Sequence, residues 1–296
     1  MNLRKLGEEQ LLHRILPYLP LNRAVLQGAG DDCAVTQSPS PGKLLLLKTD
    51  CVVEGVHFES SAAPIAVGWK AMARPLSDFA ATAGLPEFAL VTLIAPAATS
   101  VRWVEQAYRG LTKAARMFDV AIVGGETSRI DGPVCISVSV AGSVEKGRWV
   151  SRSGGQVGDE LFVTGTLGGS MRGKHLRFLP RIVEARWLTE HFSINAMMDL
   201  SDGLGVDLPR LALASGVGFE LDGAALPRTR GCSIEQALAN GEDYELLFAI
   251  SPQSAGGVQR KWRRKFPHVP LTRIGVLRPQ TARNQRTLRT GYVHFQ

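Results

Sequence analysis

The feature that most constrains the fold is a turn-rich stretch, KGRWVSRSGGQVGDE, at residues 146–160. So many glycine, serine and short polar residues favour a connection rather than a helix or strand. On either side of it, apolar segments with strand-like and helix-like spacing are mixed, and a chain of 296 residues is long enough for two domains. We therefore predict an α+β protein with an N-terminal domain at 1–148 and a C-terminal αβ domain at 149–296.

Apolar periodicity predicts the elements within each half. In the N-terminal half we expect Pro75 to kink or interrupt a helix, and Gly124 and Gly125 to end a strand. The expected N-terminal helices are 8–18, 63–83 and 101–117, and the expected strands of a single sheet are 43–50, 88–95, 120–125 and 133–144. The C-terminal half is expected to hold strands at 160–165, 216–221, 244–250 and 270–277, helices around 181–190, 204–214 and 254–265, and a turn at 199–204.

Composition excludes several classes of protein. No apolar run approaches the roughly 18–20 residues that span a bilayer, and Glu8 and Glu9 interrupt the N-terminus where a secretory signal needs an apolar core. We therefore expect a cytoplasmic protein with no membrane partner. The four cysteines are dispersed, so we expect neither a zinc site nor a disulfide framework.

The net charge is +7, and basic residues cluster around Trp262. A nucleic-acid patch and a solvated helix face both fit such a cluster. Because no nucleic-acid-binding motif accompanies it, we favour the solvated face and expect no nucleic-acid partner. A basic surface also attracts small anionic substrates.

Acidic residues stand repeatedly beside glycine or a small hydroxyl residue where strands give way to loops. Carboxylate oxygens in such places suit Mg²⁺, which is typically shared between one or two carboxylates and substrate phosphates. Any one of these motifs alone is more simply read as an Asx-turn or helix cap, but five in one chain favour a polyphosphate–metal site. The five motifs are GAGDDC (28–33), KTD (48–50), LSD (76–78), GGET (124–127) and DLSDGL (199–204).

Other phosphate-binding and catalytic signatures are missing. The sequence has no GxxxxGK[ST] loop, no GxGxxG between a strand and a helix, and no protein-kinase motif set. TGTLGGS (164–170) fits a phosphate-contacting loop and an ordinary turn equally well. No nucleophile–base pair is evident, and His57 taken alone is more simply a structural histidine.

Together, these motifs resemble those of thiamine-monophosphate kinases, within the aminoimidazole ribonucleotide synthetase-like superfamily, over about residues 7–295. VEGVHF, DLSDGL and GEDYELL are the most specific of them. The motifs that carry the resemblance, in order, are GAGDDCA, TDCVVEGVHF, LSDFAA, RSG followed by GD, TGTLGGS, DLSDGL, GEDYELLF and GYVHF.

The resemblance implies an ATP- and Mg²⁺-dependent phosphotransferase whose acceptor is the phosphate of thiamine monophosphate. It also implies two α+β domains, the N-terminal ones pairing into a β-barrel across a homodimer. Several Mg²⁺ ions would be held by Asp32, Thr49, Asp50, Asp78, Glu126, Asp199 and Asp202. The nucleotide would contact Gly125, Glu126, Arg152 and Ser201. Thiamine phosphate would contact His57, Glu242 and the stacking aromatic Tyr292.

A phosphate monoester has a second pKa of about 6, so its attacking oxygen is already largely deprotonated at neutral pH. No general base is then required, and catalysis reduces to positioning and charge neutralisation. We therefore predict no catalytic side chain beyond those that position metals and phosphates.

The chain departs from the usual family pattern at four positions. Glu126 replaces an Asp, Lys48 replaces a Ser or Thr, Pro75 replaces an Asn, and Asn240 replaces a Gly. These changes surround the expected phosphate site. The alternative interpretation is therefore a nucleotide-binding paralogue with a different phosphorylated acceptor or little activity.

Overall fold

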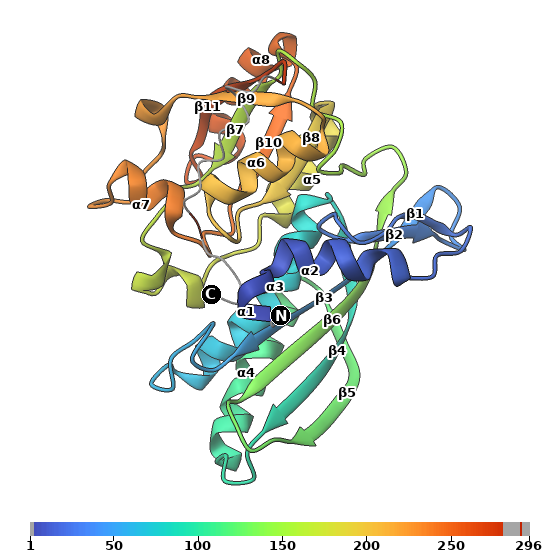
Figure 1. Ribbon diagram of the computed structural model, residues 1–296, viewed down its shortest axis with the longest axis vertical. Coiled ribbons are helices and arrows are strands. Elements are labelled where there is room, and N and C mark those ends of the chain that lie inside the picture. The colour runs from blue at the N-terminus through green and yellow to red at the C-terminus, as the bar shows by residue number, and fades with distance from the viewer. Residues whose placement is uncertain (1–2, 281–290, 292–296) are drawn as a thin grey trace.

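The computed structural model describes residues 3–280 and 291 (Figure 1). The N-terminal part is built on a six-stranded sheet with the order β1-β2-β3-β6-β4-β5. Its long central strands pair antiparallel, and the edge strand β5 runs parallel to β4. The strands are β1 (Val25–Gln27), β2 (Ala34–Gln37), β3 (Lys43–Val53), β4 (Leu85–Ala95), β5 (Ala121–Arg129) and β6 (Cys135–Glu145).

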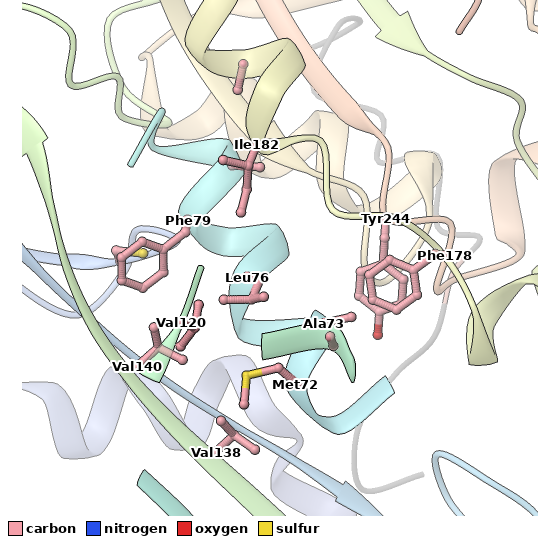
Figure 2. Packing of buried hydrophobic residues seen from close by; sticks show 14 of the residues in the cluster. Met72, Ala73, Leu76, Phe79, Val120, Val138, Val140, Phe178, Ile182 and Tyr244 are labelled. Carbon is pink, nitrogen blue, oxygen red and sulfur yellow. The ribbon is translucent and has the colours of Figure 1, made fainter. Parts of the chain in front are cut away.

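Two long helices, α3 (Pro64–Ala81) and α4 (Val101–Met117), cover one face of this sheet. Figure 2 shows Met72 and Leu76 of α3 pointing toward Val138 and Val140 of β6, and all four side chains are buried. The opposite face has no such cover in the described chain. Large apolar side chains stay exposed there.

The C-terminal part is built on a five-stranded antiparallel sheet with the order β8-β10-β7-β11-β9. Apolar clusters lie on both of its faces, as expected for a sheet between helices. The remaining elements are α1 (Leu3–Leu6), α2 (Glu8–Ile15), β7 (Glu160–Thr164), α5 (Ile182–His191), β8 (Ile194–Asp199), α6 (Leu204–Ala214), β9 (Gly218–Leu221), α7 (Ile234–Ala239), β10 (Leu246–Ile250), α8 (Pro252–Lys265) and β11 (Leu271–Arg278).

Helix α3 connects the two parts. It contacts β3 and β6 of the first sheet and also α5 and β8 of the second part. Figure 1 shows α3 and α5 between the two sheets. One buried apolar cluster accordingly runs from Leu46 in β3 through α3 to Phe248 in β10. Side chains at the C-terminal end of α3 are therefore placed where both parts of the molecule can reach them.

The four strands predicted for the N-terminal sheet are confirmed, because all four belong to one sheet. One detail was wrong, because the strand at 120–125 does not end at its glycines but continues to Arg129. Helix α3 runs through Pro75 without interruption, and the alternative of a kink there stays a prediction. A Cβ on Gly125 would lie 1.7 Å from the carbonyl oxygen of Val91, so this glycine allows close pairing with β4 rather than a turn.

The domain division near residue 148 falls between β6 and β7 and stays a prediction. The five basic residues around Trp262 are exposed on α8, while Trp262 itself is 1% exposed and packed inward. Among the described helices, none combines the length and the apolar character needed to cross a lipid bilayer.

Candidate active site

Helix α3 presents a polar stripe that runs from its middle toward its C-terminal end. Lys70, Arg74 and Asp78 recur every four residues, so they share one face of the helix. Lys70 is fully buried, and Asp78 is 6% exposed. Buried charges are retained only with partners, and each of these side chains has an oppositely charged partner from another element.

Three aspartates from distant parts of the chain meet at this stripe. Asp32 follows the short strand β1, Asp78 lies in α3, and Asp199 ends β8. All three are buried, and one carboxylate oxygen from each lies within 4.8 Å of the others. Ser77 donates a hydrogen bond of 2.5 Å to Asp199 Oδ2. The predicted acidic cluster therefore forms with these three members.

Asp50 lies beside this cluster, linked to it by a lysine. Lys48 Nζ lies 2.7 Å from Asp78 Oδ1 and 3.8 Å from Asp50 Oδ2. Arg74 Nη2 lies 3.4 Å from Asp50 Oδ1, and Arg74 also donates to the carbonyl of Cys51 at 2.9 Å. Two cationic side chains thus neutralise the Asp50–Asp78 side of the site.

Arg152 makes the corresponding contact on the other side. Its Nη2 lies 2.6 Å from Asp32 Oδ1, and its backbone N–H donates to Asp31 Oδ2 at 3.2 Å. Asp32 Oδ2 is buried and has no hydrogen-bond partner. An unpaired buried carboxylate oxygen is costly unless a ligand completes it.

Charge crowding perturbs these groups. Burial, together with the charge of Asp32, raises the pKa of Asp199 to about 7. Burial acts to lower the pKa of Lys48, but the charges of Asp78 and Asp50 outweigh it and raise that pKa. Burial acts to raise the pKa of Asp50, but Lys48 and Arg74 hold that pKa below its usual range.

The DLSDGL and GEDYELL motifs run side by side. The backbone N–H of Glu242 donates to Ser201 O at 2.7 Å, and that of Tyr244 donates to Leu200 O at 2.8 Å. These bonds extend the pairing of β8 with β10, whose register places Leu246 opposite Asp199. Glu242 and Tyr244 adopt φ values of 62° and 52°. Left-handed backbone outside glycine is concentrated at binding sites, so this loop is a candidate contact for a ligand.

Lys70 joins this loop to the N-terminal part. Its ammonium donates to Glu242 Oε2 and to the carbonyl oxygen of His57, both at 2.5 Å. Burial lowers the pKa of Lys70 to about 8 against the opposing charge of Glu242. His57 Nδ1 accepts from the backbone N–H of Val53 at 3.1 Å, which orients the ring. His57 and Glu242, both predicted to contact thiamine phosphate, are therefore held together through one lysine.

Asp202 lies three residues beyond Asp199, in the turn before α6. It forms an ion pair with Arg210, which also lies 3.2 Å from Asp207 Oδ1. Asp207 in turn accepts from the backbone N–H groups of Asp202 and Gly203. In the described structure these contacts hold the turn that positions Asp199.

Two predicted metal ligands lie elsewhere. Alternate side chains along β3 point to opposite faces of the sheet. Asp50 points toward α3. Thr49 points to the open face, where it is exposed and its Oγ1 lies 3.0 Å from Ser139 Oγ. Glu126 in β5 is paired with Thr92 in β4, Thr92 with Ser137 in β6, and Ser137 with Cys51 in β3. Paired residues point to the same face of a sheet, and so do Cys51 and Thr49, which are two residues apart in β3. Glu126 therefore shares the open face with Thr49.

Glu126 and Gly125 are exposed on the edge strand β5, three strands from Asp50. At about 4.8 Å per strand, Glu126 is roughly 14 Å away from that carboxylate. The single chain thus does not bring all six predicted acids together. Tyr292 lies outside the described residues.

Sequence reasoning missed Lys70, Arg74 and Arg210 as members of this network. A signal for the first two was present, because charged residues four apart in an apolar helix predict a buried polar stripe. Arg210 also carried a signal, because it lies three residues after Asp207, a helical spacing that favours an ion pair.

The acidic cluster fits a hard divalent cation. Mg²⁺ prefers carboxylate oxygens, and Asp32, Asp78 and Asp199 offer three of them within 4.8 Å, beside the unpartnered Oδ2 of Asp32. The donor set contains no thiolate or imidazole, so it favours Mg²⁺ or Mn²⁺ over softer metals.

Comparison with known proteins places this geometry in a family context. Residues 30–144 match the AIR synthase related protein, N-terminal domain, and residues 152–280 match the corresponding C-terminal domain. The chain is 37% identical to the thiamine-monophosphate kinase of Rhodopirellula baltica, over 91% of this chain and 92% of the relative. It is 36% identical to that of Aquifex aeolicus, over 93% and 92%. A solved structure of AaThiL complexed with AMPPCP and TMP superimposes with a TM-score of 0.84 and 34% identity, covering 99% of both chains.

Proposed function

This chain belongs to the family of thiamine-monophosphate kinases, and on that premise we propose that it transfers the terminal phosphate of ATP to thiamine monophosphate. The products are ADP and thiamine diphosphate. The observation that carries the proposal is the convergence of Asp32, Asp78 and Asp199 within 4.8 Å, in a fold shared with a protein that binds AMPPCP, an ATP analogue, and TMP.

The difficulty of this reaction is charge, because one polyanion must meet another in line. Asp32, Asp78 and Asp199 would hold Mg²⁺. Asp50 adjoins them, because it shares Lys48 with Asp78, and Asp202 lies three residues beyond Asp199. When bound, the metal ions neutralise the phosphate oxygens and orient them. The attacking oxygen belongs to a phosphate that is mostly deprotonated at neutral pH, so the protein need supply no base.

The protein side chains position the two substrates. We assign Gly125, Glu126, Arg152 and Ser201 to the nucleotide. Arg152 is the best supported, since its guanidinium points at Asp32 and its Nε is buried without a partner. The acceptor site comprises His57 and Glu242, linked by Lys70, together with Tyr292.

The open face of the N-terminal sheet fits a second copy of this chain. Leu47, Phe88, Leu90 and Val123 are 43–58% exposed there, around a hollow of about 420 Å³. Contiguous exposed apolar residues of this kind mark interaction surfaces. We assign this face to a homodimer in which two such sheets pair as a β-barrel. Thr49 and Glu126, on the same face, would then lie at the interface.

The proposal is tested by measuring ADP release with ATP and Mg²⁺ in the presence of thiamine monophosphate, thiamine or an aminoimidazole-type acceptor. Release should depend on thiamine monophosphate and on Mg²⁺, because only that acceptor has both the ring system and a phosphate. Release that is the same without an acceptor, or greater with another acceptor, would refute it.

A further inference from the structure

The position of Lys48 between two carboxylates carries an inference about how many metal ions the site holds. Its Nζ lies 2.7 Å from Asp78 Oδ1 and 3.8 Å from Asp50 Oδ2. A divalent cation bound at this place would bridge the same two carboxylates. The ammonium group and a metal ion cannot both occupy it.

The charges on this side of the site already balance. Asp50 and Asp78 contribute two negative charges, while Lys48 and Arg74 contribute two positive charges. All four side chains are at least three-quarters buried, so the pairing is only weakly screened by solvent. A further divalent cation would therefore find no uncompensated negative charge between Asp50 and Asp78.

The charges on the other side of the cluster, formed by Asp32 and Asp199, are less fully paired. Asp199 Oδ2 accepts from the neutral hydroxyl of Ser77, and Asp32 Oδ2 is buried without a partner. Arg152 supplies one positive charge to Asp32 through Oδ1. Oxygen atoms with unused capacity therefore remain on the Asp32–Asp199 side.

We propose that the ammonium group of Lys48 takes the place of a divalent cation between Asp50 and Asp78, so that metal ions bind only on the Asp32–Asp199 side. Lys48 is then a positioning residue with a fixed charge that does not dissociate at low metal concentration. The inference rests on the proposed function for the choice of Mg²⁺ and Mn²⁺ as the ions. Its test uses no substrate, so its failure is distinguishable from failure of the phosphoryl transfer.

The test counts Mn²⁺ bound to the metal-free, full-length protein by electron paramagnetic resonance of the free ion. Lys48→Ala should bind one Mn²⁺ more per chain than the wild type, because it exposes Asp50 and Asp78 to the solvent ion. Lys48→Arg keeps the charge and should match the wild type. Lys43→Ala is the matched control. It removes a lysine from the same strand at about 16 Å from Lys48 and should not change the count.

A second variant covers the case in which Lys48→Ala does not fold. Asp50→Asn, made in the otherwise unchanged chain, should leave the Mn²⁺ count as it is, whereas Asp199→Asn should lower it by at least one. An unchanged count in folded Lys48→Ala, a gain in Lys48→Arg, or the loss of an ion in Asp50→Asn would each overturn the proposal.

Discussion

Asp199 differs from the other two members of the acid cluster in the partner that binds it. Asp32 and Asp78 contact Arg152 and Lys48, whereas Asp199 accepts from the hydroxyl of Ser77. Burial and the neighbouring charge of Asp32 raise its pKa to about 7. In the absence of metal, this ionised carboxylate therefore lowers the stability of the fold, although the proposed metal site requires it. Such a trade-off is common where function requires charges to be crowded together.

Asp199→Asn should separate these two effects. The substitution removes a repelled charge and a proposed Mg²⁺ ligand while retaining the side-chain shape. We expect kcat/KM for phosphoryl transfer to fall by about 100-fold or more, and the melting temperature in EDTA to rise by about 2–4 °C for each kcal/mol of relieved repulsion. The measurements are ADP release and thermal unfolding.

Asp131→Asn is the matched control, since Asp131 is exposed and pairs with exposed Arg129. In the control, kcat/KM and the melting temperature in EDTA should both equal the wild-type values within error. A metal-free melting temperature that falls in Asp199→Asn would contradict the account of this residue.

For single residues, the sequence predicts which residue types form the site better than it predicts where they lie. Asp32, Asp78 and Asp199 could be found because acids beside glycine or serine mark loops and strand ends. Thr49 and Glu126 could not be placed, because the face to which each points depends on strand alternation and register, and the order of strands in a sheet cannot be read from one sequence.

Helices α3 and α4 approach each other closely at two glycines. A Cβ on Gly68 would lie 1.8 Å from the carbonyl oxygen of Ala107, and one on Gly110 would lie 2.0 Å from that of Ile65. The two helices therefore touch backbone to backbone. This contact fixes α3, which carries Lys70, Arg74 and Asp78, against α4.

Gly68→Ala should therefore destabilise the protein by about 2–3 kcal/mol, because the added methyl group forces the helices apart. Gly256→Ala is the control, since Gly256 also lies within a helix but a Cβ there meets nothing within 4 Å. That variant should be more stable by about 0.5–1 kcal/mol, because alanine reduces the conformational entropy of the unfolded chain. Denaturant unfolding measures both, and equal effects of the two substitutions would contradict the packing argument.

The pairing of Glu145 with Arg186 joins β6 to α5, and so joins the two parts of the molecule. The contacts are 2.9 and 3.1 Å, and the hydrogen bonds from Arg186 lower the pKa of Glu145 to about 2. Because the pKa of this carboxyl group is lower in the folded state, its ionised form stabilises the fold at pH values above its unfolded-state pKa, which is near 4.5. This stabilisation is lost as the pH falls toward 2.

Glu145→Gln should remove this pH-dependent contribution. Wild type should be more stable than the variant at pH 6, by about 1 kcal/mol or less because Glu145 is 39% exposed. The difference should shrink as the pH falls from about 4.5 to 2. Unfolding curves across this range test the prediction, and a difference that grows on acidification would contradict it.

At the scale of elements, long amphipathic segments are the most predictable part. The helices at 101–117 and 204–214 form at the predicted residues. The strand β8 was missed, because its segment INAMMD carries an asparagine and two methionines and lacks the alternation typical of a half-buried strand. Strand β5 was predicted too short, because its glycines serve close strand pairing, which depends on a neighbour that lies elsewhere in the sequence.

For the whole molecule, the proposed homodimer depends on the open face of the N-terminal sheet. Val123→Lys places a charge on that face in the edge strand β5, where Val123 is 58% exposed beside Phe88 and Leu90. We expect the variant to elute as a monomer while the wild type elutes as a dimer. Val183→Lys on α5, at 62% exposure, is the control and should remain dimeric.

Size-exclusion chromatography with light scattering measures both variants. A wild-type protein that is monomeric at all concentrations would contradict the proposed assembly. If Val123→Lys is monomeric and also inactive, the result would further support an interfacial role for Thr49 and Glu126.

The two parts of the molecule share one apolar core, and the proposed site lies where that core ends. Phe178 and Tyr244 stack with ring centroids 3.8 Å apart and face Ala73 of α3 (Figure 2). The acid cluster takes Asp78 from α3 and Asp199 from β8. The site therefore requires both parts to be folded and docked, and neither part alone is expected to retain the activity.

The central claim is phosphoryl transfer from ATP to the phosphate of thiamine monophosphate, and the most direct test follows the transferred group. The protein is incubated with Mg²⁺, thiamine monophosphate and ATP labelled in its terminal phosphate, and the thiamine products are separated by chromatography. The account predicts that the label appears in thiamine diphosphate in equal amount to the ADP formed, and that Asp199→Asn lowers the rate of labelling by about 100-fold or more. Label that appears only as inorganic phosphate, or an unlabelled thiamine fraction despite bound nucleotide, would contradict the account.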